Sequence, residues 1–151
     1  MIFLSKFTNK LDSKGRISVP SQFRNILTTD NNNSVILYPS FIHECIEACT
    51  YSRINRIAES IDNIDPYSEE RDSFATSILG GCEQLNIDKD GRINLPQEMI
   101  EFAKLNKNAV FVGKGQTFEI WNKESFEEYE SKAKEIAKNK RGLLKINKLE
   151  Q

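Results

Sequence analysis

The hydrophobic and polar positions along the chain form a pattern of short strands and amphipathic helices that occurs twice. In the first half, apolar residues bounded by turn residues predict strands at 7–11, 16–19, 34–38 and 44–48. Pro20 opens a short helix with Phe23 and Leu27 on its apolar face, because proline is well tolerated in a first helical turn. An amphipathic helix over 54–64 completes this small unit.

The second half repeats this order of elements. Pro96 again opens a helix, and strands are expected at 109–112 and 117–121. Apolar residues at helical spacing then predict a long final helix that contains residues 126–137. The two halves are therefore expected to fold alike.

A ten-residue segment in each half carries the clearest sequence repeat. Residues 11–20 match residues 87–96, with Asp, Gly, Arg, Ile and Pro identical and the flanking apolar positions preserved in kind. The offset between these copies is 76 residues, whereas residues 46–48 match 118–120 at an offset of 72. We assign the difference of four residues to a longer loop in the polar stretch 28–34.

The repeat divides the chain into two units, a linker and a tail. The boundaries are 5–60 for the first unit, 61–80 for a linker with a helix over 68–79, 81–135 for the second unit and 136–151 for a basic tail. A single unit has too few strands to bury its own apolar face. Two units can share a barrel-like core without open sheet edges. The fold class expected is mainly β with helices (α+β).

Each copy of the repeat contains a tight turn followed by an arginine. Aspartate suits the first position of such a turn and glycine its last, where a positive φ is cheapest for glycine. The turn residues are Asp12, Gly15, Asp88 and Gly91. In one interpretation Arg16 and Arg92 only pair with these aspartates. In the other, which we favour, the aspartate holds each arginine extended, and the guanidinium reads O6 and N7 of guanine in a major groove.

Further cations surround the two turns. Contacts to phosphates give affinity and register without reading sequence, and the candidates are Lys10, Lys14, Arg24 and Lys89. The second unit has Asp90 where the first has Lys14, and Ile100 where the first has Arg24. Because both changes remove positive charge, we expect the first unit to make the stronger DNA contact.

The overall charge hides a strong segregation along the chain. The formal net charge of the 151 residues is −1, which by itself argues mildly against a nucleic-acid binder. Residues 1–29 carry five cations and only one acidic residue, whereas residues 62–72 carry five acidic residues and one cation. The local field around the turns therefore matters more than the total charge.

The sequence lacks the residue patterns that several classes of function require. No apolar run is long enough for a membrane span and no signal peptide is recognisable, so we expect a cytoplasmic protein. Cys45, Cys49 and Cys82 are an odd number of cysteines and are expected to stay reduced. Cys45, Cys49 and His43 lack a fourth ligand at the spacing of a zinc site. No catalytic pair or phosphate-binding glycine loop is present, so no enzyme, cofactor, metal or small-molecule substrate is expected.

The repeated motif also carries a family resemblance. Residues 11–20, followed by Phe23-Arg24, resemble the AbrB-type swapped-hairpin DNA-binding element. Two copies, with Gly80-Gly81 before the second, resemble the MraZ family of transcriptional regulators over residues 1–129. The resemblance implies a double-split β-barrel and ring-like homo-oligomers associated with the nucleoid. It also implies binding to repeated G-rich boxes in double-stranded DNA, at the promoter of the family's own cell-division and cell-wall operon.

Two other functions stay open from the sequence. An AbrB-like antitoxin binds a toxin protein as well as DNA, although such proteins usually carry one hairpin unit and a disordered arm. A scaffold without DNA contact is the other alternative. The two units that fill this chain favour the DNA-binding regulator.

Overall fold

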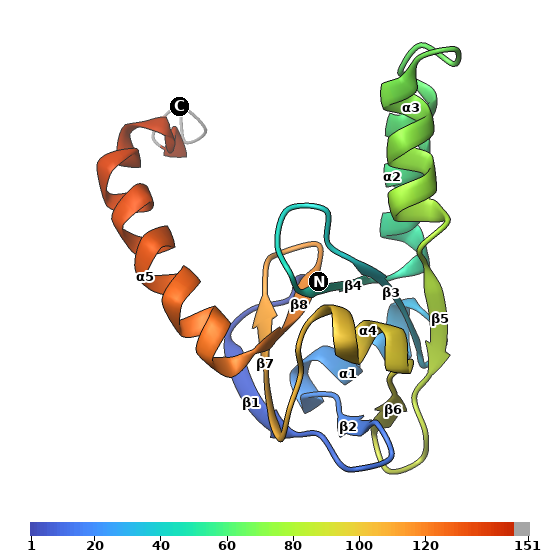
Figure 1. Ribbon diagram of the computed structural model, residues 1–151, viewed down its shortest axis with the longest axis vertical. Coiled ribbons are helices and arrows are strands. Elements are labelled where there is room, and N and C mark those ends of the chain that lie inside the picture. The colour runs from blue at the N-terminus through green and yellow to red at the C-terminus, as the bar shows by residue number, and fades with distance from the viewer. Residues whose placement is uncertain (147–151) are drawn as a thin grey trace.

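The computed structural model describes residues 1–146 and shows an α+β fold with one long antiparallel sheet, a two-stranded ribbon and projecting helices (Figure 1). The strands are β1 Lys6–Lys10, β2 Arg16–Ser18, β3 Ser34–Pro39, β4 Ile46–Cys49, β5 Glu83–Asn86, β6 Arg92–Asn94, β7 Asn108–Gly113 and β8 Phe118–Asn122. The helices are α1 Ser21–Asp30, α2 Tyr51–Asp62, α3 Glu69–Phe74, α4 Gln97–Phe102 and α5 Lys123–Asn139, with short π-helical η1 Ala75–Leu79 and 3-10 helical η2 Arg141–Leu143. Every strand and helix expected from the hydrophobic pattern is therefore confirmed, with shifts of a few residues at the ends.

Helix ends follow local capping chemistry. α2 begins three residues before the expected helix, because the side chain of Thr50 accepts a hydrogen bond from the backbone N–H of Arg53. Ser68 caps α3 in the same way through Arg71. The expected linker helix is α3 continued by the π-helical turn η1.

Strands of the two sequence units are interleaved in the sheet. The order of the six-stranded sheet is β1-β7-β8-β4-β3-β5, so the first strand of each unit pairs with a strand of the other unit. β2 and β6, one from each unit, form the separate two-stranded ribbon. The hairpin of each unit is thereby inserted into the other, and neither unit has a sheet of its own.

The strand register makes the two units equivalent by a pseudo-twofold rotation. Ile17 faces its own repeat equivalent, Ile93, at the centre of the β2–β6 ribbon. Glu47 faces its equivalent, Glu119, at the centre of the β4–β8 pair. An antiparallel pair in which equivalent residues face each other has a twofold axis between them, so both ribbon strands present equivalent positions.

The extra residues of the first unit lie in two loops. β3 and β7 start at residues 34 and 108 and correspond at an offset of 74, midway between the offsets of 76 and 72. Two extra residues therefore precede β3, where Asn32 and Asn33 take positive φ angles. The other two lengthen the β3–β4 loop. The prediction that residues 28–34 hold all four extra residues is wrong. Matching the repeats on both sides of these loops gives only the total number of extra residues and not their positions.

Hydrogen bonds do not close these strands into a ring. The six-stranded sheet ends at β1 and β5, and the β2–β6 ribbon stays separate from it. The edge-free barrel expected from the sequence is not formed by the described strands. What the structure shows is a mixed α+β fold with a mostly antiparallel sheet.

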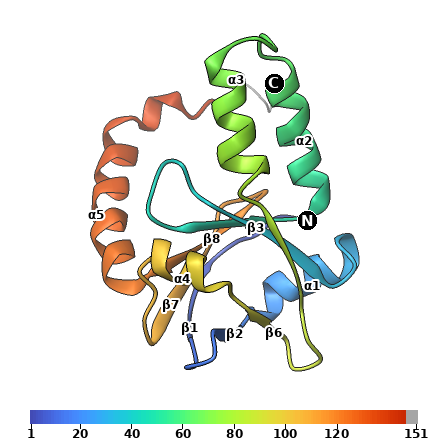
Figure 2. The same cartoon turned by 45° about the vertical axis from the view of Figure 1, so that its right-hand side comes forward.

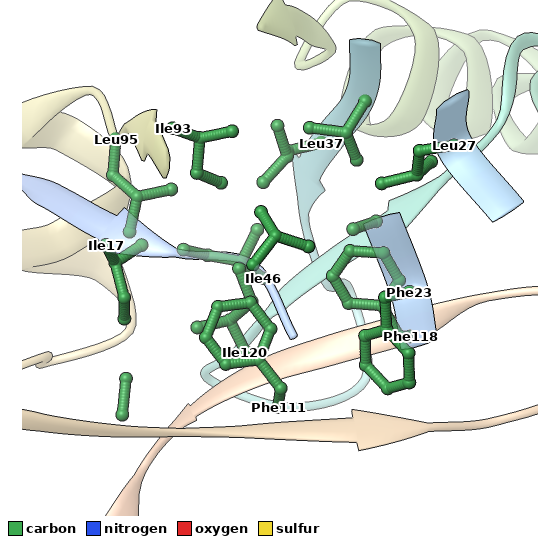
Figure 3. Packing of buried hydrophobic residues seen from close by; sticks show 14 of the residues in the cluster. Ile17, Phe23, Leu27, Leu37, Ile46, Ile93, Leu95, Phe111, Phe118 and Ile120 are labelled. Atoms are coloured by element: carbon green, nitrogen blue, oxygen red, sulfur yellow. The ribbon is translucent and has the colours of Figure 1, made fainter. Parts of the chain in front are cut away.

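One hydrophobic core joins the ribbon to the sheet. Ile17 and Ile93 of the ribbon are each 1% exposed and belong to the same cluster as Ile46, Phe111 and other sheet residues, as Figure 3 shows. Phe23 of α1 lies in this cluster too. The ribbon is therefore held on the body by buried apolar contacts and cannot swing as a free arm.

Helices α2, α3 and α5 project away from the ribbon. In both views α2 and α3 stand together as an antiparallel pair, and α5 stands apart from them (Figures 1 and 2). The ribbon lies at the opposite end of the molecule. Within residues 1–146, no helix has the length and apolar character that crossing a membrane requires.

Candidate nucleic-acid interface

The β2–β6 ribbon exposes one polar face and buries one apolar face. Ile17 and Ile93 point into the core, so their neighbours along the strands point outward. Arg16 faces Asn94 across the ribbon, and Ser18 faces Arg92. Diagonal neighbours of this kind lie about 7–8 Å apart in an antiparallel pair. The two arginines thus lie close together on one narrow surface, as the repeat predicted.

The first turn, residues 12–15, holds Arg16 firmly. The amide of Gly15 donates to the carbonyl of Asp12 at 3.1 Å, and Gly15 has a φ of +83°. Oδ1 of Asp12 accepts from the backbone N–H groups of Lys14 and Arg16, both at 2.9 Å, and Oδ2 accepts from Nε of Arg16 at 2.8 Å. The guanidinium is therefore held at its Nε, and 38% of the Arg16 side chain remains exposed.

These contacts change the acidity of the aspartate. The hydrogen bond from the backbone N–H of Arg16 is the largest cause that lowers the pKa of Asp12, and the Arg16 guanidinium and the Lys14 amide lower it further. Asp88 has a lowered pKa for the same reason, with the backbone N–H of Arg92 as the largest cause. Both aspartates therefore stay ionised well below neutral pH.

The second turn, residues 88–91, has the same backbone but holds its arginine differently. Gly91 has a φ of +81°, and Oδ1 of Asp88 accepts from the amides of Asp90 and Arg92, both at 2.9 Å. Nε of Arg92 lies 3.6 Å from Oδ2 of Asp88, and it is buried without a hydrogen-bond partner among the described residues. Its Nη2 lies 3.4 Å from Oδ2 of Asp90. Arg92 thus lies near the carboxylates of both Asp88 and Asp90 and is not held by one of them alone.

Backbone hydrogen bonds connect each turn to the other unit. Val19 donates to the carbonyl of Gly91 at 2.9 Å, and Leu95 donates to that of Gly15 at 2.8 Å. Each turn is therefore hydrogen-bonded to the strand end of the opposite unit, which fixes the position of both turns relative to the ribbon.

Arg24 lies at the second turn, although it belongs to the first unit. Its Nε donates to the carbonyl of Val19 at 2.9 Å, and a Cβ added to Gly91 would meet its Nη1 at 2.5 Å. Its repeat equivalent, Ile100, lies in the same way against Gly15 of the first turn. The expectation that Arg24 adds charge to the first turn is wrong, because the hairpins are exchanged between units. Its guanidinium therefore lies against Gly91 of the second turn.

A hollow beside the first turn brings in a cation that the sequence analysis missed. Its volume is about 610 Å³, and its lining includes Lys10, Asp12 and Lys107. The carbonyl of Lys107 accepts from the amide of Leu11 at 2.9 Å, which holds this loop against the turn. Lys10 and Lys107 are exposed at this hollow, and Lys14 is exposed in the turn beside it. Lys107 is distant in sequence and lies outside the repeat motif, so only the β1–β7 pairing reveals it.

Ser18 and Asn94 are two further polar residues of the ribbon face that the motif analysis left aside. Both are exposed, and each lies directly opposite an arginine. The period-2 alternation around Ile17 and Ile93 is the signal that could have identified them.

Comparison with known proteins points to one family. Residues 78–146 match the family model described as "MraZ protein, putative antitoxin-like". Over 144 residues, the chain is 46% identical to proteins named "Transcriptional regulator MraZ" from Rickettsia canadensis and Rickettsia felis, covering 95% of this chain and 97% of each relative. A protein of the same name from Pelagibacter ubique is 45% identical over 147 residues, covering 97% of this chain and 95% of the relative.

The chain belongs to the MraZ family. The family resemblance expected from the repeated turn is thereby confirmed. Its members are named as regulators, so the family is not one of enzymes, as the sequence indicated.

The cysteines of this MraZ-family chain are packing residues. Cys45 and Cys49 are buried, and Cys82 is half-buried. Burial raises the pKa of the Cys49 thiol to about 12 and that of Cys82 to about 11, and it also raises the pKa of Cys45. In the part of the chain that the structure describes, no group of three His, Cys, Asp or Glu side chains is arranged to hold a metal ion.

Replacing Asp12 with asparagine tests the grip on the first turn. Because the folded-state pKa of Asp12 is below its ordinary value of 3.8, the ionised carboxylate stabilises the fold above pH 3.8 and loses this effect as pH falls through the lowered pKa. We expect the parent to melt at a higher temperature than Asp12→Asn at pH 7, and the difference to shrink below pH 3.8. Thermal unfolding over a pH series measures it. A difference that persists unchanged at pH 2 would contradict this origin.

Proposed function

We propose that this chain is a sequence-specific DNA-binding transcriptional regulator that reads double-stranded DNA with the outer face of the β2–β6 ribbon. The observation that carries the proposal is the pair Arg16 and Arg92, which lie partly exposed on one narrow ribbon in an antiparallel register. A two-stranded ribbon fits a major groove, and arginine matches the acceptors of guanine there. The names of the relatives support the regulator role.

The geometry of the first turn supports readout by Arg16. Asp12 binds Nε, so the two terminal Nη groups are the part of the fork that is left for a base. Ordering the arginine before binding lowers the entropy that is lost on contact. Arg92 is divided between Asp88 and Asp90, and breaking the contact with Asp90 costs part of the energy it gains from a base. We infer that the first turn makes the stronger base contact.

Cations around both turns supply the phosphate contacts in this proposal. Lys10, Lys14 and Lys107 flank the first turn, and Lys89 and Arg24 flank the second. Such contacts fix the register of the ribbon without reading bases. The charge of the ribbon end therefore matters for affinity even though the net charge of the chain is −1.

The target and the assembly are further parts of the proposal. The resemblance to MraZ regulators supports G-rich repeats in the promoter of the chain's own cell-division and cell-wall operon as the target. Reading several repeats favours a homo-oligomer, because linked reading heads gain avidity. The interleaved strands of the two units support the double-split arrangement of this family, and a nucleoid location follows from DNA binding.

Binding to a duplex from the region upstream of the chain's own gene tests the proposal, against a duplex of the same length and composition with scrambled sequence. The chain should bind the first duplex at least about a thousandfold more tightly, the lower end of the usual specificity range. Equal affinity for both duplexes would overturn sequence-specific reading, and no binding to either would overturn DNA binding altogether.

Lys14→Ala is expected to weaken binding to both duplexes by a similar factor. The lysine is exposed in the first turn, as expected of a residue that contacts phosphates and does not read bases. The slope of log K against log salt should become shallower by about one unit. Titrations at several salt concentrations measure this slope. A loss confined to the upstream duplex would instead assign Lys14 to base reading.

The antitoxin alternative has one observation in its favour, the words "antitoxin-like" in the description of the matching family model. A toxin partner requires an arm that wraps another protein, whereas the two units and α5 fill most of the described chain with ordered elements. The DNA-binding regulator is the function that the ribbon supports directly.

A further inference from the structure

The outward face of the β2–β6 ribbon carries two small polar residues besides its two arginines. Asn94 lies directly opposite Arg16, and Ser18 lies directly opposite Arg92. Ser18 and Asn94 are repeat equivalents, because each follows the arginine of its own motif by two residues. Both are exposed. Each end of this face therefore places the arginine of one unit beside the small polar residue of the other unit.

The two ends of the face differ in chemistry, although the pseudo-twofold rotation relates their backbones. The side chain of Asn94 offers a carbonyl acceptor and an NH₂ donor on one planar amide, whereas Ser18 offers a single hydroxyl. In a major groove such an amide can bind N6 and N7 of adenine together, while a serine hydroxyl accepts more than one kind of base. Only the end that contains Asn94 therefore has a second group able to distinguish one base from the others.

The first turn places the Asn94 amide beside the arginine that is held more firmly. A Cβ added to Gly15 would meet Oδ1 of Asn94 at 3.2 Å, so the amide lies against this turn. The same turn binds Nε of Arg16 through Asp12 at 2.8 Å. The guanidinium and the amide are thus positioned by one rigid turn before any DNA is bound.

The second turn is lined differently. The three atoms nearest to a Cβ added to Gly91 all belong to the guanidinium end of Arg24. The arginine of this turn, Arg92, also lies 3.4 Å from a carboxylate oxygen of Asp90. This end therefore presents two cations and the hydroxyl of Ser18, and it lacks the amide that lies against the first turn.

The spacing of Arg16 and Asn94 suits two neighbouring base pairs. Residues directly opposite each other in an antiparallel pair have Cβ atoms about 4.5–5.5 Å apart. Successive base pairs of a duplex are separated by about 3.4 Å along its axis. A long guanidinium and a short amide at this separation can contact adjacent steps of the same groove.

We propose that Asn94 is a specificity-determining residue that binds an adenine in the base pair next to the guanine read by Arg16. The inference rests on the DNA reading of the proposed function and adds to it a second base and a residue of the other unit. A bidentate amide contact discriminates against other bases by about tenfold or more. The two ends of the ribbon then require different base pairs, in spite of the pseudo-twofold rotation between them.

A scan of single base-pair substitutions across the upstream duplex tests this assignment. For the parent, replacing one A·T pair next to an essential G·C pair should weaken binding by about tenfold. Arg16→Ala should remove the sensitivity at the G·C pair. Asn94→Ala should bind all four base pairs at the adenine position alike, while it keeps the preference for guanine beside it.

Two further variants complete the test. Ser18→Asn combined with Asn94→Ser exchanges the polar residues between the two ends and leaves the composition of the face unchanged. The adenine preference should then move beside the base pair whose sensitivity Arg92→Ala removes. The matched control Asn63→Ala makes the same substitution at an exposed position after α2, away from the ribbon, and should bind every duplex as the parent does. Thermal unfolding checks that each variant is folded.

The possible outcomes separate this inference from the proposed function. A parent that binds every substituted duplex and the scrambled duplex equally overturns both sequence-specific reading and the role of Asn94. If the parent discriminates and Asn94→Ala keeps every preference, or weakens binding equally at all positions, the role of Asn94 alone is overturned. A released position that is not an A·T pair beside the position of Arg16 also overturns it, as does an exchanged variant whose adenine preference stays where it was.

Discussion

Arg16→Ala is expected to weaken binding to the upstream duplex by about 1–3 kcal/mol, the usual scale of a bidentate base contact. The Arg16 side chain is partly exposed on the ribbon, and its guanidinium is held by Asp12 through Nε alone. Removing it deletes the groups that match guanine while the ribbon backbone stays in place. Affinity for the scrambled duplex should change much less, so the specificity ratio falls. Titration of both duplexes with parent and variant measures the effect.

Two matched variants separate base reading from other roles of this arginine. Arg16→Lys keeps the charge but loses the planar fork, so it should retain affinity for the scrambled duplex and lose discrimination. Arg92→Ala should cost less than Arg16→Ala, because Asp90 already competes for that side chain. If Arg16→Ala instead lowers the melting temperature and binds the upstream duplex as tightly as the parent, the arginine only holds its turn and the ribbon is not the reading surface.

The local elements of this protein are readable from sequence because each rests on short-range chemistry. The turn at Asp12 and Gly15 needs a carboxylate at its start and a glycine at positive φ, and both are visible in the motif. Helices α1 and α4 each begin directly after a proline, as the sequence indicates. Even the faces of the ribbon strands follow from the alternation around Ile17.

The pairing of the elements is what the motif cannot supply. A repeat in sequence is equally compatible with two separate units and with two units that exchange hairpins. Only the pairing of β1 with β7 and of β5 with β3 decides this. The error over Arg24 has this cause: its neighbour in sequence is the first turn, but its neighbour in space is Gly91.

The sequence therefore predicted the two arginines at the centre of the candidate site and missed the polar residues around them. Arg16 and Arg92 lie in the motif, and their positions follow once the hairpin is recognised. Lys107 reaches the first turn only through β1–β7 pairing, and it belongs to no repeated pattern. Ser18 and Asn94 were within reach of the alternation argument, since each lies one residue from a buried isoleucine.

Phe23→Ala is expected to lower the free energy of unfolding by about 3–5 kcal/mol, the usual cost of truncating a buried phenylalanine. Phe23 is 0% exposed, and its ring centroid lies 5.4 Å from that of Phe3, 5.5 Å from Phe7 and 4.8 Å from Phe118. These neighbours come from the chain start, β1 and β8, so the ring joins α1 to strands of both units. Its loss leaves a cavity that four separate segments would have to collapse to fill.

Chemical denaturation of the parent, Phe23→Ala and the gentler Phe23→Leu measures this cost. Leucine keeps most of the buried volume and should destabilise much less than alanine. A total stability of about 5–15 kcal/mol is typical of such domains, so the alanine variant falls near the limit of folding. The same core includes Ile17 and Ile93 beneath the ribbon, so the ribbon should unfold together with the rest of the chain. The DNA affinity of Phe23→Ala should therefore fall only in proportion to its unfolded fraction at each denaturant concentration. A Phe23→Ala protein as stable as the parent would show that the aromatic cluster does not bind the two units together, and the ribbon would then have to be held by its strand pairing alone.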